Sequence, residues 1–329
     1  MVRAPFTLRE NQETSLNVRA SNRIDMKDFL IAMKRTKWER DLEKYGSEEA
    51  LQKIYKIQNS AFDRVYDSHT RQKEALGKLR EAIANADFVS RGQLRDIDFS
   101  AYRCVVSLGG DNHFVYVSRF AKGPIIGINS DPKSSRGALL AGDCAQFLAF
   151  YNRFVDVCAD GTVDRTEYLA SQVTENWSRI ECAITLPDGT IKSIGACTSE
   201  YSVRNRFAEY MSRYLLRKGS DEFKEEKCSG LLAATGAGST GWFKNCLPEA
   251  KRNASVFPRD APFFAFVARE ALVPLGPEHV HAGEVLEIVS EMDGEIVADS
   301  DDDLSFPFPY GARASFSLSK EHLQVIHKL

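Results

Sequence analysis

The chain has 329 residues, of which 43% are hydrophobic and 27% are charged, a composition typical of a globular protein of about two domains. A net charge of −3 and a pI near 6.1 lack the basic excess of nucleic-acid-binding proteins, so we expect no nucleic-acid partner. No apolar run reaches the length of about 18 residues that a membrane span requires, and we expect no membrane partner.

The seven cysteines are scattered, without a Cys-x-x-Cys pair or a regular spacing. This distribution is typical of reduced thiols and favours a cytoplasmic protein. The segment before residue 23 is polar and lacks the apolar stretch of a secretory signal. A transit peptide, and with it the mitochondrial matrix, is the alternative.

The first half of the chain alternates strand and helix patterns. Helices are expected within 47–86, where Ser47 can cap the first of them and Leu76, Leu79 and Ile83 form one apolar face. Short apolar runs predict strands at 29–33, 88–90, 104–108 and 124–128. The alternation predicts a small parallel α/β sheet.

From about Trp177 onward the pattern is one of strands and turns. Segments 179–186 and 190–196 flank Pro187-Asp188-Gly189, a turn sequence that predicts a hairpin. Further strands are expected at 285–289, 295–298 and 314–318, the first two of them as a second hairpin. The second half is therefore expected to be an all-β domain.

The strand expected at 104–108 ends in Gly109-Gly110-Asp111. Glycines expose backbone amides that can bind phosphate, and a carboxylate at the carboxyl end of a buried strand can accept a proton. A tight turn that caps a helix would use the same three residues. The motif alone leaves both interpretations open.

Two more loops have a composition suited to nucleotides. Segment 127–132, Gly-Ile-Asn-Ser-Asp-Pro, follows the next strand and should lie beside the first loop, because consecutive strands usually neighbour each other. In segment 235–242, three glycines give the backbone conformational freedom and three hydroxyl side chains can donate hydrogen bonds. The indole ring of Trp242 provides a surface on which a base could stack. Its alternative interpretation is a glycine-rich turn with a buried Trp242.

In this order, the three loops resemble the NAD kinase family, most closely its mitochondrial branch. Residues 109–111 are similar to the start of that family's Gly-Gly-Asp-Gly-Thr motif, and 127–132 to its Gly-[Ile/Val]-Asn-[Ser/Thr]-Asp-Pro segment. Gly238, Ser239 and Trp242 are similar to its Gly-Ser-x-x-Trp ending. Ser199-Glu200 stands where the family has Asn-Glu.

The resemblance covers about residues 28–318 and implies a two-domain architecture. It implies an α/β domain over 1–145, a mainly β domain over 146–309, and a segment 310–329 that packs back on the first domain. It also implies phosphoryl transfer from ATP, or another donor, to the 2′-hydroxyl of the adenosine ribose of NAD, giving NADP. Mg²⁺ would bridge the donor phosphates, and the protein would be a homodimer or homotetramer.

The resemblance also implies roles for individual residues. Asp111 would accept the proton of the ribose hydroxyl as general base. Glu200 would hold ribose hydroxyls, and Ser239, Thr240 and Trp242 would line the adenine pocket. The other residues expected to contact NAD or ATP are Gly109, Gly110, Asn112, His113, Asn129, Asp131, Ser199, Thr235 and Gly238.

The sequence departs from the family pattern at three positions. Asn112 and His113 stand in place of Gly-Thr, and Ser199 stands in place of Asn. Asn tolerates a positive φ, but its side chain could crowd the donor. His113 is expected either to face solvent or to donate a hydrogen bond to phosphate.

These departures leave two alternatives to an NAD kinase. One is a catalytically silent protein that senses NAD or NADP. The other is a kinase of the same fold that uses a lipid or another nucleoside as acceptor. Trp242 argues against this alternative, because its ring favours a site that stacks a base over a pocket for an acyl chain.

Other candidate sites are weaker. His279 and His281 lack a third ligand nearby and are expected to be surface histidines, since zinc needs three or four ligands. The acidic run 299–303 lacks the spacing of a calcium loop and is expected to be a solvated turn. We therefore expect no metal site built by the protein alone.

Overall fold

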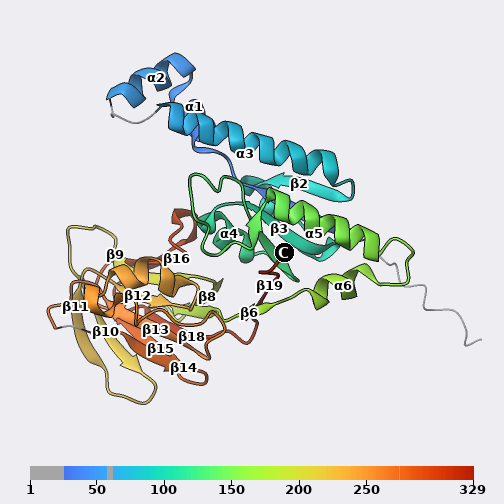
Figure 1. Cartoon of the computed structure of the whole chain (residues 1–329). Coiled ribbons are helices and arrows are strands. Elements are labelled where there is room, and N and C mark those ends of the chain that lie inside the picture. Colours follow the sequence, from blue (N-terminus) through green and yellow to red (C-terminus); the bar gives the residue numbers. More distant parts are fainter. Residues whose placement is uncertain (1–25, 58–61, 274) are drawn as a thin grey trace, which may run out of the picture.

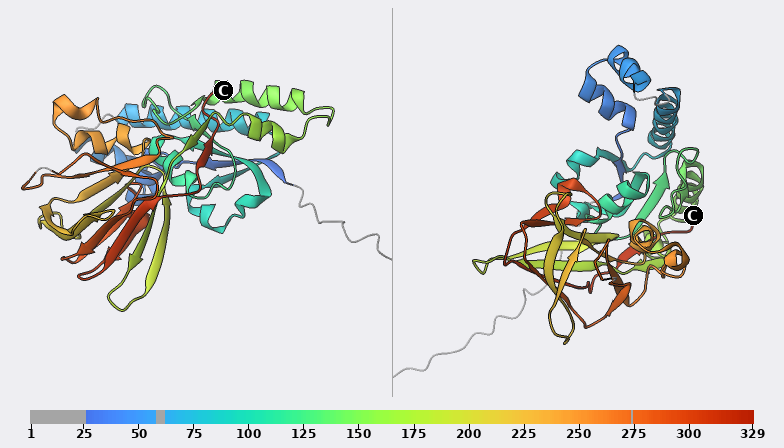
Figure 2. Two further views of the ribbon diagram at one scale, coloured as in Figure 1. Left: turned by 90° about the horizontal axis from the view of Figure 1, so that it is seen from below. Right: turned by 90° about the vertical axis from the view of Figure 1, so that its left-hand side faces the viewer.

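The computed structural model describes residues 26–57, 62–273 and 275–329, which form three sheets (Figure 1). The first sheet has seven strands, and most of the helices lie around it. The six-stranded second and third sheets are antiparallel and lie together beside it, as the two views of Figure 2 show. No helix in the described part of the chain is long and apolar enough to cross a membrane.

The first sheet is mostly parallel, in the order β2-β1-β3-β4-β19-β6, with β5 paired to β4 and β6 antiparallel to β19. The strand bounds are β1 Lys27–Met33, β2 Ala86–Ser90, β3 Tyr102–Gly109, β4 Ile125–Asn129, β5 Gly142–Asp143, β6 Glu175–Trp177 and β19 Leu323–Val325. Strand β4 is buried along its whole length, since helices cover both faces of a parallel sheet. The four strands expected in the first half are confirmed.

Of the helices in the first half, α2 and α3 lie in the range expected to be helical. The bounds of the helices are α1 Lys37–Tyr45, α2 Glu48–Ile57, α3 Phe62–Ala82, α4 Asp111–Ser118, α5 Cys144–Val157 and α6 Arg165–Ser171. Ser47 accepts a hydrogen bond from the Ala50 amide at 3.2 Å, as a cap should. Helix α1, which lies before that range, begins at a capping box of Thr36 and Glu39, and with α2 it projects from the body as an arm (Figure 1).

Helix α5 belongs to the core of the first sheet. The ring of Phe29 on β1 meets Phe147 and Phe154 of α5 edge to face, with centroids 5.8 and 5.4 Å apart. The chain leaves the first sheet only after Trp177, the last residue of β6. Strand β6 is part of the first sheet, and α5 and α6 precede it in the chain. These three elements therefore belong to the α/β part of the structure.

The second and third sheets pack face to face around one apolar core. The second sheet has the order β11 (Lys224–Cys228), β10 (Ser212–Lys218), β15 (Leu286–Ser290), β18 (Arg313–Leu318), β7 (Ile180–Thr185) and β8 (Ile191–Cys197). The third has the order β14 (Glu278–His281), β13 (Phe263–Ala268), β12 (Leu231–Ala234), β9 (Glu200–Asn205), β16 (Gly294–Ala298) and β17 (Ser305–Phe308). Across the interface, Tyr201 of β9 meets Phe316 of β18 edge to face at 5.5 Å. The expected fold class, a parallel α/β part with an all-β part, is confirmed.

One of the two expected hairpins is wrong. Strands β7 and β8 pair around the Pro187 turn as expected. Strand β15 pairs instead with β10 and β18, whereas β16 pairs with β9 and β17 in the other sheet. Alternating burial and a turn sequence predict two strands, but they do not choose between a hairpin and a step from one sheet to the other.

Short helices cover the outer face of the third sheet (Figure 1). These are η3 (Gly238–Thr240), α7 (Trp242–Asn245) and α8 (Glu249–Arg252). Phe243 and Leu247 pack there on Leu232 and Val267. This packing fixes the glycine-rich segment against the sheet.

Candidate functional site

The first two loops meet at the carboxyl edge of the parallel sheet. Gly109 of β3 is the register partner of Asn129 of β4, and the Ser130 amide donates to the Gly109 carbonyl oxygen at 3.1 Å. A Cβ on Gly109 would lie 2.8 Å from a ring carbon of His113, so only glycine fits there. The expectation that these loops lie side by side is confirmed.

Asp111 is the first residue of α4, with Gly110 as the N-cap. Its two carboxylate oxygens accept hydrogen bonds from the amides of Leu139 at 2.9 Å and Ala138 at 3.0 Å. The side chain is half-buried and so remains accessible. The loop that follows β4 therefore orients the carboxylate.

Asn129 and Asp131 give that loop its shape. The Asn129 amide group donates to the Ser135 carbonyl oxygen at 2.9 Å, and its oxygen accepts from the Asp131 amide at 3.0 Å. Arg71 of α3 donates two hydrogen bonds to Asp131, at 2.7 and 3.1 Å. Burial by itself would raise the pKa of Asp131, but the hydrogen bonds from Arg71, Ser134 and Ser68 lower it to about 2. The side chains of Asn129 and Asp131 thus form hydrogen bonds within the protein, and these bonds hold the loop in shape.

His113 points into the core beneath the Gly-Gly-Asp loop. It is 2% exposed, and its Nε2 lies 3.1 Å from the carbonyl oxygen of Ala32 on β1. A carbonyl can only accept, so Nε2 carries the hydrogen. Burial lowers the pKa of His113 to about 4, which leaves the ring neutral at pH 7. The expectation that His113 faces solvent or donates to phosphate is wrong, because the ring is buried and bonds to the backbone of β1. The neighbouring side chain of Asn112 is exposed.

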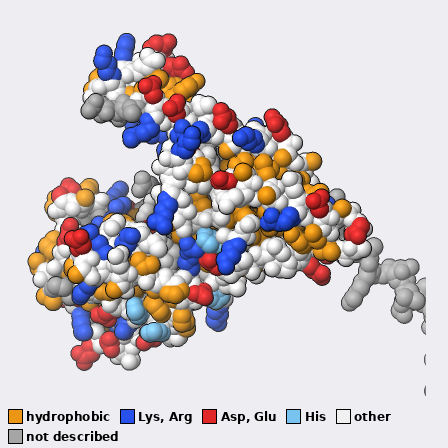
Figure 3. Space-filling model, in the orientation of Figure 1, with side chains coloured by type: hydrophobic (Ala, Val, Ile, Leu, Met, Phe, Trp, Pro, Cys, Tyr) orange, Lys and Arg blue, Asp and Glu red, His pale blue; other side chains and the backbone are white. Residues whose placement is uncertain are grey.

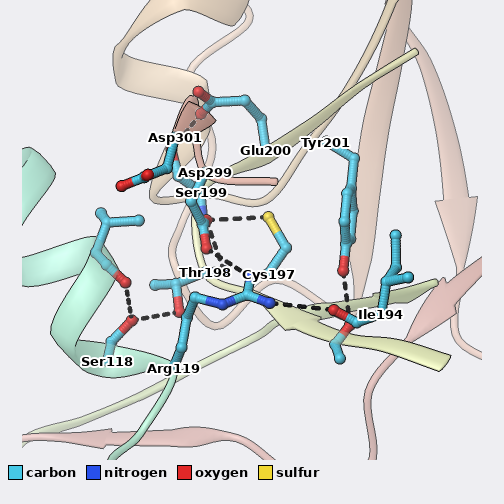
Figure 4. A network of polar contacts seen from close by, with 12 residues as sticks. Ser118, Arg119, Ile194, Cys197, Thr198, Ser199, Glu200, Tyr201, Asp299 and Asp301 are labelled. Atoms are coloured by element: carbon cyan, nitrogen blue, oxygen red, sulfur yellow. Dashed lines mark hydrogen bonds and ion pairs between the residues drawn. The ribbon is translucent and has the colours of Figure 1, made fainter. Parts of the chain in front are cut away.

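A second polar cluster surrounds Glu200 (Figure 4). Glu200 opens β9, is 5% exposed, and accepts hydrogen bonds from the hydroxyls of Ser199 and Ser300. Burial, with a smaller effect from the Asp299 carboxylate, raises the pKa of Glu200. The Asp299 amide donates to the Glu200 carbonyl oxygen at 2.7 Å, which holds the two acidic residues together.

Asp299 joins this cluster to helix α4 (Figure 4). Its carboxylate accepts hydrogen bonds from the amides of Thr198 at 3.0 Å and Ser199 at 2.8 Å, and Arg119 forms an ion pair with it at 3.1 Å. Ser118, the last residue of α4, also shares a hydrogen bond with the Thr198 hydroxyl at 2.7 Å. The expectation of a solvated acidic turn is thus wrong at Asp299, which is 8% exposed.

The glycine-rich loop packs directly on the Ser199–Glu200 backbone. The Thr235 amide donates to the Ser199 carbonyl oxygen at 2.9 Å, and the Thr235 hydroxyl donates to the Thr198 carbonyl oxygen at 2.6 Å. A Cβ on Gly238 would lie only 2.3 Å from the Ser199 carbonyl oxygen, so a side chain there would displace the backbone. The structure therefore brings together the Ser199-Glu200 motif and the glycine-rich loop of the resemblance.

The three residues expected in one adenine pocket are placed apart. Ser239 is fully buried, and its hydroxyl donates to the Gly236 carbonyl oxygen at 2.7 Å. Thr240 lines a cavity of about 610 Å³ between the two parts of the chain. Trp242 lines a different cavity, of about 440 Å³, where the Arg269 guanidinium lies 4.7 Å from a ring centroid of the indole.

Arg259, which sequence reasoning missed, connects the two parts of the site. Its guanidinium donates to the Ala138 carbonyl oxygen at 2.8 Å, pairs with Glu175 at 3.0 Å and lies 4.6 Å from the Trp177 ring centroid. It lines the same cavity as Thr240. A single arginine in a loop has no spacing pattern, so no sequence signal indicated it.

No metal centre built by protein side chains is present among the described residues, in which no three His, Cys, Asp or Glu side chains converge. His279 and His281 are exposed on β14, with ring centroids 6.2 Å apart. The expectation that they are surface histidines is confirmed.

Comparison with known proteins yields structural likeness only. No protein-family model matches the sequence, and no curated protein matches it. An NAD kinase from Archaeoglobus fulgidus, solved in complex with ATP, is 18% identical with a TM-score of 0.54, covering 89% of this chain and 91% of that one. The yeast NADH kinase, complexed with NADH, is 11% identical with a TM-score of 0.61, covering 95% and 89%. The chain therefore has the fold of the NAD kinases.

Proposed function

We propose that this protein transfers a phosphoryl group from ATP to the 2′-hydroxyl of the adenosine ribose of NAD, giving NADP. One observation carries the proposal. Asp111 offers an oriented, accessible carboxylate at the carboxyl edge of the parallel sheet, in a fold shared over 89% of the chain with a kinase solved with ATP. Ligands of open α/β sheets bind at this edge.

A ribose hydroxyl is a poor nucleophile at neutral pH, so a base must accept its proton during attack. Each oxygen of Asp111 accepts one amide hydrogen bond and keeps a further lone pair for that proton. Glu200, oriented by the hydroxyls of Ser199 and Ser300, would accept hydrogen bonds from ribose hydroxyls.

Mg²⁺ would neutralise the charge that spreads over the transferring phosphoryl group. Because no cluster of three metal-ligating side chains occurs in the described ranges, the donor phosphates would supply most of its oxygen ligands. Asp111 is the carboxylate of the Gly-Gly-Asp loop that could add one more.

A second candidate function is a silent sensor of NAD or NADP. It is favoured by the engagement of both Asp111 oxygens with the amides of Ala138 and Leu139. It is also favoured by the burial of His113 at the position where the resemblance has a threonine.

An assay specific for NADP distinguishes the two functions. Protein incubated with NAD, ATP and Mg²⁺ should form NADP, and Asp111→Asn should lower kcat by about 10²- to 10⁴-fold, because the base is lost. Calorimetry should give the same affinity for NAD in both proteins. If the wild type forms no more NADP than Asp111→Asn while NAD still binds, the enzyme is excluded and the sensor is supported.

A further inference from the structure

The peptide group between Ala138 and Leu139 lies between two charged side chains. Its N–H, on Leu139, donates to the Asp111 carboxylate at 2.9 Å, and its carbonyl oxygen, on Ala138, accepts from the Arg259 guanidinium at 2.8 Å. A peptide group is planar, so the directions of its N–H and C=O bonds are fixed relative to each other. A movement of the carbonyl bond must therefore also disturb the hydrogen bond to Asp111.

The two hydrogen bonds of this peptide group also strengthen each other. Each has a charged partner, the guanidinium or the carboxylate, and such bonds are about twice as strong as bonds between neutral groups. A hydrogen bond to the carbonyl oxygen polarises the peptide group and makes its N–H a better donor. Arg259 therefore acts on Asp111 without touching it.

Arg259 is held at the junction between the two parts of the chain. Its carbonyl oxygen accepts a hydrogen bond from the Ser178 amide at 2.8 Å, and its side chain is 22% exposed. The guanidinium pairs with Glu175 at 3.0 Å and lies 4.6 Å from the Trp177 ring centroid. Figure 3 shows basic, acidic and histidine side chains together where the two parts meet. These contacts present the guanidinium to Ala138 in a fixed direction.

The C-terminal segment adds a titratable partner to this guanidinium. Nε2 of His327 lies 3.0 Å from the same Arg259 nitrogen that pairs with Glu175. A guanidinium can only donate, so Nε2 must accept and the imidazole ring must be neutral. A proton on Nε2 would place two donors against each other and add a second positive charge beside the guanidinium.

The charged groups that act on His327 in the described part of the chain are Arg259, Glu175 and Lys328. Burial and the charge of Arg259 lower the pKa of His327 below its ordinary value of 6.5, Glu175 opposes them, and Lys328 adds to the lowering. The uncharged ring of Trp177 lies 6.0 Å away, between centroids. The imidazole is therefore neutral at pH 7 and becomes charged as the medium turns acidic.

We propose that Arg259 is a positioning residue, which holds the Asp111 carboxylate through the Ala138–Leu139 peptide group as long as His327 is neutral. Protonation of His327 pushes the guanidinium away from the Ala138 carbonyl oxygen and leaves the carboxylate less well oriented. The effect on catalysis rests on the proposed function, whereas the hold on Asp111 does not.

Kinetics of the full-length protein test the effect on the reaction. Arg259→Met should lower kcat about tenfold, as expected for one lost hydrogen bond to a charged group, and leave KM for NAD and ATP unchanged. Arg259→Lys, which can still donate to Ala138, should restore part of the rate. In an Asp111→Asn background, Arg259→Met should cause no further loss, because the group through which it acts is gone.

Arg217 on β10 offers a matched control. It donates to Glu287 at 2.7 Å and lies over the Phe223 ring at 4.4 Å, so its surroundings resemble those of Arg259. Arg217→Met should keep the wild-type kcat. An equal loss of kcat in Arg217→Met would overturn the proposal. A raised KM for NAD at unchanged kcat in Arg259→Met would also overturn it, because Arg259 would then bind substrate.

The pH profile of kcat tests the part played by His327. His327→Gln keeps an acceptor for Arg259 but takes up no proton, so kcat should fall less below about pH 6.5 than in the wild type. By NMR, the pKa of His327 should rise in Arg259→Met, because a neighbouring cation is removed. Identical pH profiles, or an unchanged pKa of His327, would overturn this coupling.

Hydrogen exchange separates the hold on Asp111 from the proposed reaction. At pH 7 the Leu139 amide should exchange about tenfold faster in Arg259→Met than in the wild type, and at the wild-type rate in Arg217→Met. Faster exchange in a protein that forms no NADP supports the hold and rejects the reaction. NADP formation with unchanged exchange and unchanged kcat in Arg259→Met rejects the hold and supports the reaction.

Discussion

His113 is a buried neutral histidine beneath a loop that is expected to bind phosphate. Its pKa of about 4 in the folded chain lies below the ordinary value of 6.5. As the pH falls, the unfolded chain therefore takes up a proton first. Stability is lost between about pH 6.5 and pH 4, by about 3 kcal/mol in total.

The first prediction follows from this linkage. His113→Gln should be less stable than the wild type at pH 7, because the Gln side chain packs differently against Gly109. The difference in unfolding free energy should shrink by about 2 to 3 kcal/mol between pH 7 and pH 4.5, because Gln takes up no proton. Urea unfolding at both pH values measures it.

If the difference for His113→Gln is the same at both pH values, the histidine is not held neutral by burial.

At the scale of elements, helix α4 connects the two halves of the proposed site. It begins at Asp111 and ends at Ser118, next to Arg119, which pairs with Asp299. The side chains of Arg119 and Asp299 are 12% and 1% exposed. The buried carboxylate at the end of β16 therefore depends on a cation from the first half of the chain.

The second prediction concerns this pair. Arg119→Met should cost about 3 to 5 kcal/mol of unfolding free energy, because it leaves Asp299 buried without its cation. Arg119→Met/Asp299→Asn should cost less than the sum of the two single variants, since neither charge of the pair then remains buried without its partner. Urea unfolding of the wild type and the three variants measures the coupling.

Lys227, whose side chain is 37% exposed and pairs at 2.8 Å with the exposed Glu225, gives the matched control. Lys227→Met should change stability by no more than about 1 kcal/mol, because solvent screens an exposed pair. Strict additivity of the Arg119 and Asp299 variants would show that the two side chains do not stabilise each other.

At the scale of the whole molecule, the C-terminal segment closes the first sheet. Strand β19 pairs with β4 and β6, and the Ile326 amide donates to the Ile125 carbonyl oxygen at 3.0 Å. Ile326 is fully buried in the same apolar cluster as Phe29. The two ends of the described chain therefore share one core.

The third prediction tests this closure. Ile326→Ala should cost about 2 to 5 kcal/mol through lost burial and the cavity left behind. Hydrogen exchange should become faster in β4. Val157→Ala, at a position 44% exposed, should stay within about 0.5 kcal/mol of the wild type. Equal stability of the two variants would mean that the C-terminal segment adds nothing to the core.

The sequence by itself determined the features that depend on neighbouring residues. Apolar runs located β1, β2, β3 and β4 of the first sheet, and Pro187-Asp188-Gly189 located a hairpin. The position of Asp111 at the carboxyl edge of the parallel sheet also followed, because Gly109-Gly110-Asp111 ends an apolar run. The capping box at Thr36 was a local signal that we missed.

Only the tertiary structure decided the features that join distant segments. It placed β15 and β16 in different sheets, buried His113, paired Arg119 with Asp299, and put Thr240 and Trp242 on different cavities. Local pattern cannot decide these, because burial and pairing depend on which remote side chain fills the adjoining space.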